Sequence, residues 1–155
     1  MHPYVRPTTA EDVTFVAEHM RVEDIAEVRA ASGRTPLDAL RFCVAFSDTP
    51  LTLCDPASGR TMGLLGVVRE DATVGHVWML GTPLIAELSM TFLRRSRVVA
   101  DGLNQVYPLL TNCVDERNEV HVKWLRWLGF KFIRRIPDYG TERRPFLEFA
   151  RVPEI

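Results

Sequence analysis

The sequence of 155 residues lacks the features of several common classes of protein. Its three cysteines, Cys43, Cys54 and Cys113, are scattered, odd in number and without metal-ligand spacing, so we expect reduced thiols and no metal site. No apolar run approaches the roughly 20 residues of a membrane-spanning helix. The first residues contain acids and no apolar core, unlike a signal peptide. We therefore expect a soluble, cytoplasmic protein without membrane contacts.

An excess of charge of one sign is also missing. The net charge is −1, whereas a nucleic-acid-binding domain more often carries a basic excess on one face. Nucleic acid is therefore not an expected partner. A hydrophobic content of 46% is enough for a core in a chain of this length. We find no internal repeat, low-complexity tract or linker, and we expect one domain over residues 1–155.

Hydrophobic periodicity predicts an α/β (α+β) fold with a mixed sheet. Thr8 or Thr9 is expected to cap the first helix, Gly33 to end the second, and Thr35 to cap the third. The expected elements are a strand over 4–7, helices over 8–20, 20–33 and 35–47, and a hairpin of strands 51–54 and 62–68. They continue with a strand over 76–82, a helix over 83–104, a strand over 109–115, a helix over 118–128, and closing strands over 130–136 and 145–152.

Two of these elements carry internal irregularities. The long helix over 83–104 is expected to break near Ser89 or Arg94, because three arginines within four residues interrupt its apolar stripe. Gly63 and Gly66, inside the second strand of the hairpin, predict a bulge or a close approach of the backbone.

The segment 118–130 is the most readable part of the chain. Gly129 stands where a helix would end in a left-handed residue, and Phe130 begins an alternating strand. With the strand before it, this segment forms a strand–helix–strand crossover that has Asn118 at its turn. Its apolar residues share one helix face: Val120, Trp124, Leu125, Trp127 and Leu128.

This order of elements resembles the fold of the GCN5-related N-acetyltransferases (GNAT). Members of that family commonly have an asparagine after the fifth strand and a Gly-Phe pair eleven and twelve residues later. Asn118, Gly129 and Phe130 have that spacing here. The opening VRPTTAEDV is also similar to the family's. The resemblance spans nearly the whole chain and implies a mostly antiparallel central sheet of about six to seven strands with helices on both faces.

Within that fold, the sequence resembles small GNAT-like proteins of short-tailed phages, including the group called internal virion protein A. The matching stretches are VRPTTAEDV, the strand end VWML, FLRRSR, and the spacing N-x-x-H-x-x-W-L-x-x-x-G. This likeness implies phage or prophage origin and the host-cell cytoplasm as location. It also raises the alternative of a place in the virion, with phage structural proteins as partners.

The resemblance implies an acetyl-CoA site between the fourth and fifth strands. In the family, the pantetheine arm pairs with backbone groups that the splayed strands leave free, here those of Trp78, Met79 and Leu80. The pyrophosphate rests on amides at the start of the next helix, usually in a glycine-rich (Arg/Gln)-x-x-Gly-x-(Gly/Ala) segment. This sequence has no glycine between Thr82 and Gly102.

The nearest substitute for the glycine-rich segment is a basic run. Arg94, Arg95 and Arg97, with Ser96 among them, could hold phosphates through charge and hydrogen bonds. The alternative is the solvated face of a surface helix, which is the usual role of a run of charges. Asn118 completes the cofactor residues that the resemblance implies.

The expected catalytic groups are less well marked. Many catalytic members of the family place a tyrosine seven residues after the asparagine, where it can protonate the leaving thiolate, and that position is Leu125 here. Asp115 and His121 are the nearest candidates for proton transfer. Asp115 could instead cap the helix, and His121 could be a hydrogen-bonded structural histidine.

In the family fold the acceptor pocket is shaped by the first two helices. Asp24 and Glu27 could bind a basic amine there, and one of them could act as the base; alternatively, Asp24 forms an ion pair with Arg21 or Arg29. Two hypotheses result. One is an acetyl-CoA-dependent N-acyltransferase that acts on an amine of a small molecule or a protein. The other is a catalytically inactive GNAT-fold protein that serves as a binding or virion-associated component.

Overall fold

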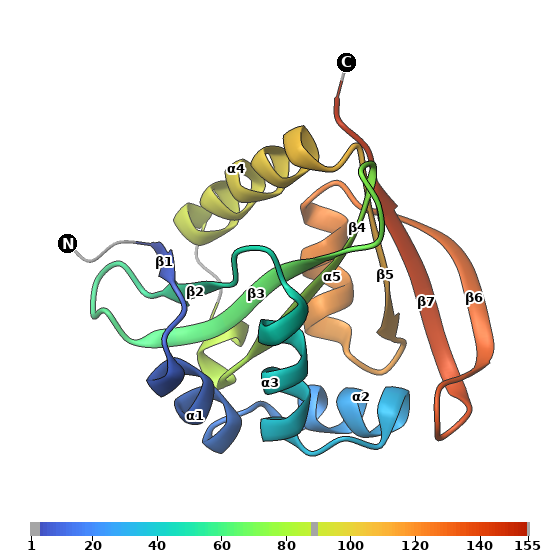
Figure 1. Ribbon diagram of the computed structural model, residues 1–155, viewed down its shortest axis with the longest axis horizontal. Coiled ribbons are helices and arrows are strands. Elements are labelled where there is room, and N and C mark those ends of the chain that lie inside the picture. The colour runs from blue at the N-terminus through green and yellow to red at the C-terminus, as the bar shows by residue number, and fades with distance from the viewer. Residues whose placement is uncertain (1–3, 88–89, 155) are drawn as a thin grey trace.

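The computed structural model describes residues 4–87 and 90–154. Its centre is a seven-stranded sheet in the order β1-β2-β3-β4-β5-β7-β6 (Figure 1). The strands are β1 (Val5–Pro7), β2 (Leu51–Cys54), β3 (Thr61–Arg69), β4 (Val74–Gly81), β5 (Leu109–Asp115), β6 (Lys131–Tyr139) and β7 (Arg144–Arg151). The helices are α1 (Ala10–Glu18), α2 (Val22–Ser32), α3 (Pro36–Phe46), α4 (Met90–Val106) and α5 (Glu119–Trp127), with a 3-10 turn, η1, at Pro83–Ala86.

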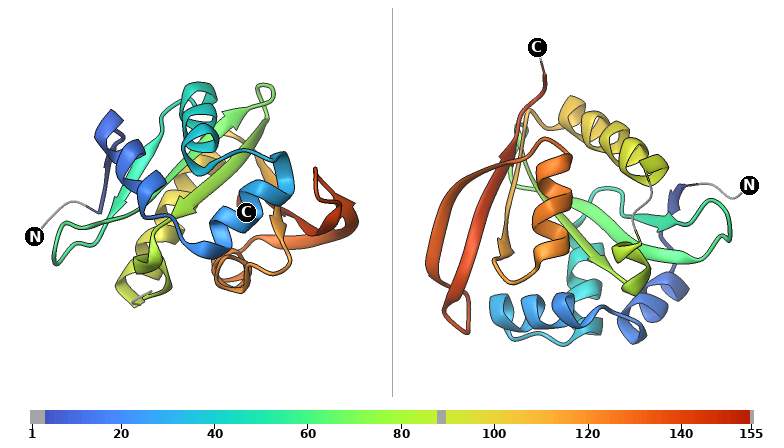
Figure 2. Two further views of the ribbon diagram at one scale, coloured as in Figure 1. Left: turned by 90° about the horizontal axis from the view of Figure 1, so that it is seen from below. Right: turned by 180° about the vertical axis from the view of Figure 1, so that it is seen from behind.

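The sheet is covered on both faces. Helices α1, α2 and α3 lie on one side and α4 and α5 on the other (Figure 2). Each side has its own apolar core: Val16, Leu40 and Leu64 are buried under the first group, and Phe92 and Trp124 under the second. The β4–β5 pair is parallel and the other neighbouring strands are antiparallel. The predicted α/β fold with a mostly antiparallel sheet is therefore confirmed.

The helix ends follow the expected local chemistry. The Thr9 hydroxyl accepts the Asp12 N–H, and the Asp12 carboxylate accepts the Thr9 N–H, which makes a capping box. Thr35 caps α3 in the same way from its side chain. Gly33 and Gly129 follow α2 and α5 with φ of 73° and 90°, a conformation that favours glycine. These predicted caps and stops are confirmed.

The predicted helix over 83–104 needs a correction. Pro83–Ala86 is a 3-10 turn, and α4 runs from Met90 to Val106. The helix is continuous through Arg94, so a break there is wrong, because arginine is a good helix former and points to solvent at this position. A break at Ser89 lies outside the described residues. The buried face of α4 continues past the arginines through Ser96 and Ala100.

The glycines of β3 lie where the strands approach closely. A Cβ on Gly63 would stand 2.8 Å from the Leu80 carbonyl oxygen, and one on Gly66 would stand 2.8 Å from the Trp78 Nε1. The β2–β3 register also shifts next to Gly63, beyond Leu53. Both predicted features, a close approach and a bulge, are present.

Strands β4 and β5 diverge along their length (Figure 1). They pair only from Val74 with Leu109 to His76 with Thr111. Beyond that point the Asn112 side chain spans the start of the gap and donates a hydrogen bond of 2.7 Å to the Val77 carbonyl. The opening between the two strands is the feature that positions the candidate site.

Candidate functional site

A cavity of about 260 Å³ lies at the gap between β4 and β5. Its walls come from both faces of the sheet: α2 and α3 contribute Glu27 and Cys43, and α4 and α5 contribute Val99, Trp124 and Leu125. The cavity therefore extends through the thickness of the sheet. Most of its lining is apolar, and its carboxyl, hydroxyl, amide and imidazole groups belong to Glu27, Tyr4, Ser96, Tyr139, Asn112 and His121.

The edge of β4 presents backbone groups to this gap. The Val77 carbonyl accepts the Asn112 amide, and the Gly81 N–H donates to Asp24 Oδ2 at 2.8 Å. Both of these β4 backbone groups point away from β3. Because backbone groups alternate in direction along a strand, the N–H and C=O of Met79 point to the same side. Met79 is thus the β4 residue whose main chain is directed into the gap.

Trp78 and Leu80 differ from Met79 in this respect. They stand opposite Gly66 and Leu64 of β3, and alternation turns their backbone groups toward that strand. Both side chains line the cavity, and the Trp78 indole donates 2.7 Å to Ser47 Oγ. Of the three β4 residues predicted to offer backbone groups, only Met79 therefore directs its main chain into the gap.

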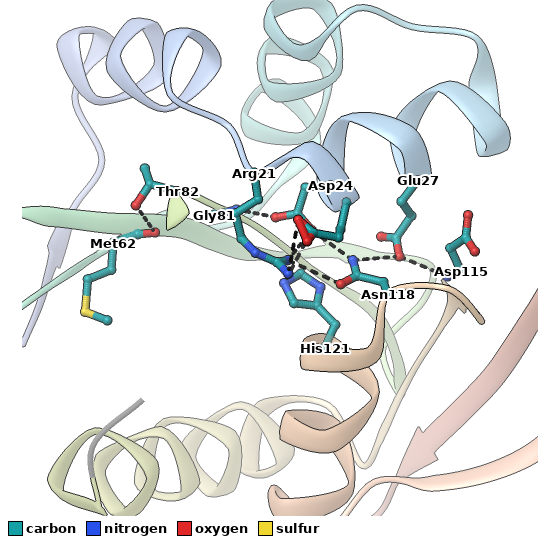
Figure 3. A network of polar contacts seen from close by, with 10 residues as sticks. Arg21, Asp24, Glu27, Met62, Gly81, Thr82, Asp115, Asn118 and His121 are labelled. Carbon is teal, nitrogen blue, oxygen red and sulfur yellow. Dashed lines mark hydrogen bonds and ion pairs between the residues drawn. The ribbon is translucent and has the colours of Figure 1, made fainter. Parts of the chain in front are cut away.

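A buried polar network lies at the open end of the gap (Figure 3). Asp24, with no exposed surface, accepts hydrogen bonds from the Arg21 guanidinium at 2.9 Å, the Asn118 amide at 2.9 Å and the Gly81 N–H. Arg21 also donates to the Asn118 Oδ1, and its backbone N–H to the Gly81 carbonyl. The predicted alternative of an Asp24–Arg21 ion pair is confirmed, and Asp24 joins α2, β4 and α5.

Glu27 lies next to this network and also lines the cavity. Its Oε1 accepts the Asp115 N–H at 2.9 Å and the Asn118 amide at 3.3 Å. Desolvation, followed by the nearby charge of Asp24, raises the pKa of Glu27 from 4.5 to about 8, although the two hydrogen bonds oppose the change. A carboxyl with such a pKa exchanges its proton near physiological pH.

His121 is 5% exposed and lines the cavity from α5. Its Nε2 stands 3.5 Å from Asp24 Oδ1 and has no hydrogen-bond partner among the described residues. Desolvation lowers the pKa of His121, with the Asp24 charge acting in the opposite direction, so the ring is neutral near pH 7. The structure therefore brings His121 to the site together with Asp24 and Glu27.

Asp115 is held differently from these residues. It is 2% exposed and forms a 2.7 Å ion pair with Arg117. Although burial acts in the opposite direction, the hydrogen bonds from Arg117 lower the pKa of Asp115, so this carboxyl is a poor base. The prediction that it caps a helix is wrong: Asn118 is the N-cap residue of α5, and Asp115 accepts the Arg117 N–H ahead of the helix.

The predicted phosphate-binding residues 94–97 lie in two different environments on α4. Arg94 and Arg97 are exposed, and the Arg97 guanidinium lies 5.3 Å from the Trp127 ring. Ser96 is buried on the cavity side, where it shares a hydrogen bond of 2.8 Å with the Tyr4 hydroxyl. The partly buried Arg95 lies over the Tyr4 ring at 5.9 Å. Only the exposed arginines are therefore free to meet phosphate from solvent.

Sequence reasoning missed several groups of the cavity. Tyr4, Tyr139 and Cys113 all line it, and burial raises the pKa of Tyr4 to about 12. Tyr4 precedes β1, Tyr139 ends β6 and Cys113 lies in β5, and the three carry no motif, so only the topology could bring them together. Leu125, the position for which the resemblance implied a tyrosine in many catalytic members, lines the cavity.

Two features are absent from the described residues. Residues 4–87 and 90–154 contain no group of three or more His, Cys, Asp or Glu side chains that could hold a metal ion. No helix within those ranges is long and apolar enough to cross a membrane. The three cysteines are free thiols.

The structure shares its architecture, over nearly all of its length, with solved acetyltransferases of the GNAT type. Among solved structures, a ribosomal-protein-alanine N-acetyltransferase from Brucella melitensis matches with a TM-score of 0.67 and 11% identity, over 96% of this chain and 98% of that chain. Spermidine N-acetyltransferase from Vibrio cholerae, in complex with CoA and spermine, matches with a TM-score of 0.66 and 12% identity, over 96% and 94%.

A GNAT-superfamily phosphinothricin acetyltransferase from Sinorhizobium meliloti, in complex with AcCoA, matches with a TM-score of 0.65 and 14% identity, over 99% of this chain and 89% of that chain. No protein-family model and no curated protein sequence matches this chain. At these identities the likeness is one of fold. This chain therefore has the GNAT fold.

Proposed function

We propose that this protein transfers an acyl group from acetyl-CoA to an amine. The observation that carries the proposal is the cavity that passes through the sheet between β4 and β5, with Glu27 in its wall. The gap directs the Met79 main chain toward any extended arm placed there, as a neighbouring strand would pair with it. The proposed setting for this activity is the cytoplasm.

Glu27 is the proposed base. Both of its hydrogen bonds use Oε1, which leaves Oε2 to take a proton from the acceptor ammonium group. The neutral amine then attacks the thioester carbonyl carbon, the C–N bond forms, the C–S bond breaks, and the second nitrogen proton passes to solvent to leave the neutral amide. A thiol has a pKa near 8.5, so the leaving thiolate is stable enough near neutral pH to depart without a protein acid. Leu125 is compatible with the reaction for this reason.

The acceptor can be an amine of a small molecule or a protein. Glu27 is the carboxyl group in the cavity wall, whereas Asp24 is committed to Arg21, Asn118 and Gly81. Asp24 is thus proposed to hold the site together, and Glu27 to meet the amine. His121, neutral and next to Asp24, is a proposed second proton acceptor.

Arg94 and Arg97 are proposed to bind the phosphates of the cofactor. Replacing both with alanine should weaken binding of acetyl-CoA and leave binding of acetyl-pantetheine, which lacks the nucleotide phosphates, unchanged. Arg60, an exposed arginine of the β2–β3 turn, provides the matched control. Equal affinities of the wild type and the double variant for acetyl-CoA would exclude these arginines from the phosphate site.

The second candidate is a GNAT-fold protein of phage origin that binds partners, in the virion for example, without catalysis. The observation in its favour is Leu125 in the cavity wall, together with the absence of glycine over positions 83–101 of the sequence. Phage structural proteins are its proposed partners, from the resemblance of four short stretches to small phage proteins.

Thiol release distinguishes the two candidates. The protein is incubated with acetyl-CoA and a panel of amines that includes polyamines, amino acids and peptide N-termini, and free CoA is measured. The proposed enzyme releases CoA with at least one amine, and Glu27→Gln loses most of that activity. Binding of acetyl-CoA without release for any amine favours the inactive candidate.

A further inference from the structure

Trp124 is a buried tryptophan whose polar group has no partner. It is 6% exposed, lies on α5 and lines the cavity. Its indole Nε1 has no hydrogen-bond partner among the described residues. The indole N–H is a donor only, so a suitable partner must be an acceptor. Buried tryptophans usually find one, which makes this group an exception that requires an explanation.

Packing alone does not explain a tryptophan at this position. The ring packs against Phe92 at a centroid distance of 5.6 Å, within the core on the α4 and α5 side. A phenylalanine could provide apolar contact there without burying an unpaired donor, which is costly. The N–H has no partner among the described residues, and an acceptor that enters the cavity would supply one.

A second observation points to the same place. His121, one turn earlier on α5, is also buried and also lines the cavity, and its Nε2 has no hydrogen bond among the described residues, with the Asp24 carboxylate at 3.5 Å. The two rings have centroids 6.3 Å apart. Two of the buried polar atoms without partners thus belong to adjacent turns of one helix in one cavity wall. Such a pair is expected where a ligand with polar atoms replaces the missing partners.

We propose that the Trp124 indole N–H donates a hydrogen bond to a carbonyl oxygen of the acyl-pantetheine arm. This inference rests on the proposed function, because it takes acetyl-CoA as the occupant of the cavity. The arm carries two amide carbonyls and the thioester carbonyl, which are acceptors, and it is otherwise mainly apolar. Trp124 fixes the arm from the α5 side of the cavity, opposite the Met79 main chain on β4.

The chain contains a matched control for this role. Trp127 lies three residues further along α5, is 36% exposed, and donates its indole N–H to the Leu93 carbonyl at 3.3 Å. Trp124→Phe removes a donor without a partner, and Trp127→Phe removes a donor that has one. Without ligand, Trp124→Phe should lose only the apolar contacts of the larger ring, whereas Trp127→Phe also removes the hydrogen bond to Leu93, and urea unfolding measures both losses.

The affinities for ligand separate the two variants. Isothermal titration with CoA and with acetyl-CoA should give about tenfold weaker binding for Trp124→Phe, since about tenfold is the expected effect of one hydrogen bond. Trp127→Phe, whose ring contacts the proposed phosphate ligand Arg97, should keep the wild-type affinity for acetyl-pantetheine, which lacks the nucleotide phosphates. Weakening with both ligands assigns the bond to an amide carbonyl. Weakening with acetyl-CoA alone assigns it to the thioester carbonyl.

Nuclear magnetic resonance gives an independent readout. The indole ¹H–¹⁵N signal that disappears in Trp124→Phe should move when acetyl-pantetheine, which lacks the nucleotide phosphates, is added to the wild type, whereas the Trp127 signal beside Arg97 should stay in place. Unchanged affinity of Trp124→Phe for both ligands, with CoA binding by the wild type intact, overturns the inference alone. Absence of CoA binding by the wild type overturns the proposed function and this inference with it.

Discussion

Replacing Glu27 with glutamine should change both the activity and the pH dependence of stability. The pKa of this carboxyl is raised to about 8, chiefly by desolvation. As a base it must be ionised, and about one-tenth of it is ionised at pH 7 against about nine-tenths at pH 9. We therefore expect kcat/KM of the wild type to rise about ninefold from pH 7 to pH 9. This rise should be absent in Glu27→Gln.

Raising the pH should lower the stability of the protein, although it raises the activity. The pKa of Glu27 is higher in the folded state, about 8, than its ordinary value of 4.5, so the folded protein binds the proton more strongly. The contribution of protonated Glu27 to the free energy of unfolding is fully present below about pH 4.5 and is lost as the pH rises toward 8. Between pH 5 and pH 7 the loss is about 2–3 kcal/mol, at about 1.4 kcal/mol for each pH unit. The amide of Glu27→Gln removes this dependence.

Urea unfolding from pH 5 to pH 8 measures that difference, and CoA release at pH 7 and pH 9 measures the activity. Glu23→Gln on the same helix is the control, since the Glu23 side chain is 52% exposed. The reasoning is refuted when Glu27→Gln keeps the wild-type slope of stability with pH, or the ninefold rise of kcat/KM. Loss of the same pH dependence of stability in Glu23→Gln would also contradict the assignment of this dependence to Glu27.

Two other substitutions test the structure around the site. Asp24→Ala removes the buried partner of the Arg21 charge, which then keeps only the exposed Glu23 at 3.7 Å, and should lower the free energy of unfolding by about 3 kcal/mol in urea unfolding, against little change for the exposed Glu18→Gln. Gly66→Ala places a Cβ 2.8 Å from the Trp78 indole nitrogen. It should therefore lower the free energy of unfolding by about 1–3 kcal/mol in urea unfolding, and wild-type stability of this variant would contradict the expected clash.

The elements of the fold were predictable because their signals are local. The Thr9 capping box and the Gly33 and Gly129 stops follow from side-chain hydrogen bonds and positive φ within a few residues. The incorrect break at Arg94 has a physical origin as well. Arginines interrupt an apolar stripe in the sequence, but they do not interrupt a helix whose buried face continues through Ser96.

The site was predictable only in part, because its residues meet through tertiary contacts. The spacing of Asn118 from Gly129 indicated the crossover, but nothing local shows that Asn118 is hydrogen-bonded to Asp24 and Glu27, which precede it by 94 and 91 positions. The raised pKa of Glu27 depends on that packing. The unpartnered Trp124 N–H likewise appears only once the cavity around it is known.

Binding of acetyl-CoA tests the central claim of the account most directly, namely that the cavity between β4 and β5 holds the acyl-pantetheine arm. Thermal unfolding of the wild-type protein is followed at increasing acetyl-CoA concentrations. At one hundred times the dissociation constant, the ligand should stabilise the protein by about 2.7 kcal/mol. No shift in Tm at millimolar acetyl-CoA would contradict the account.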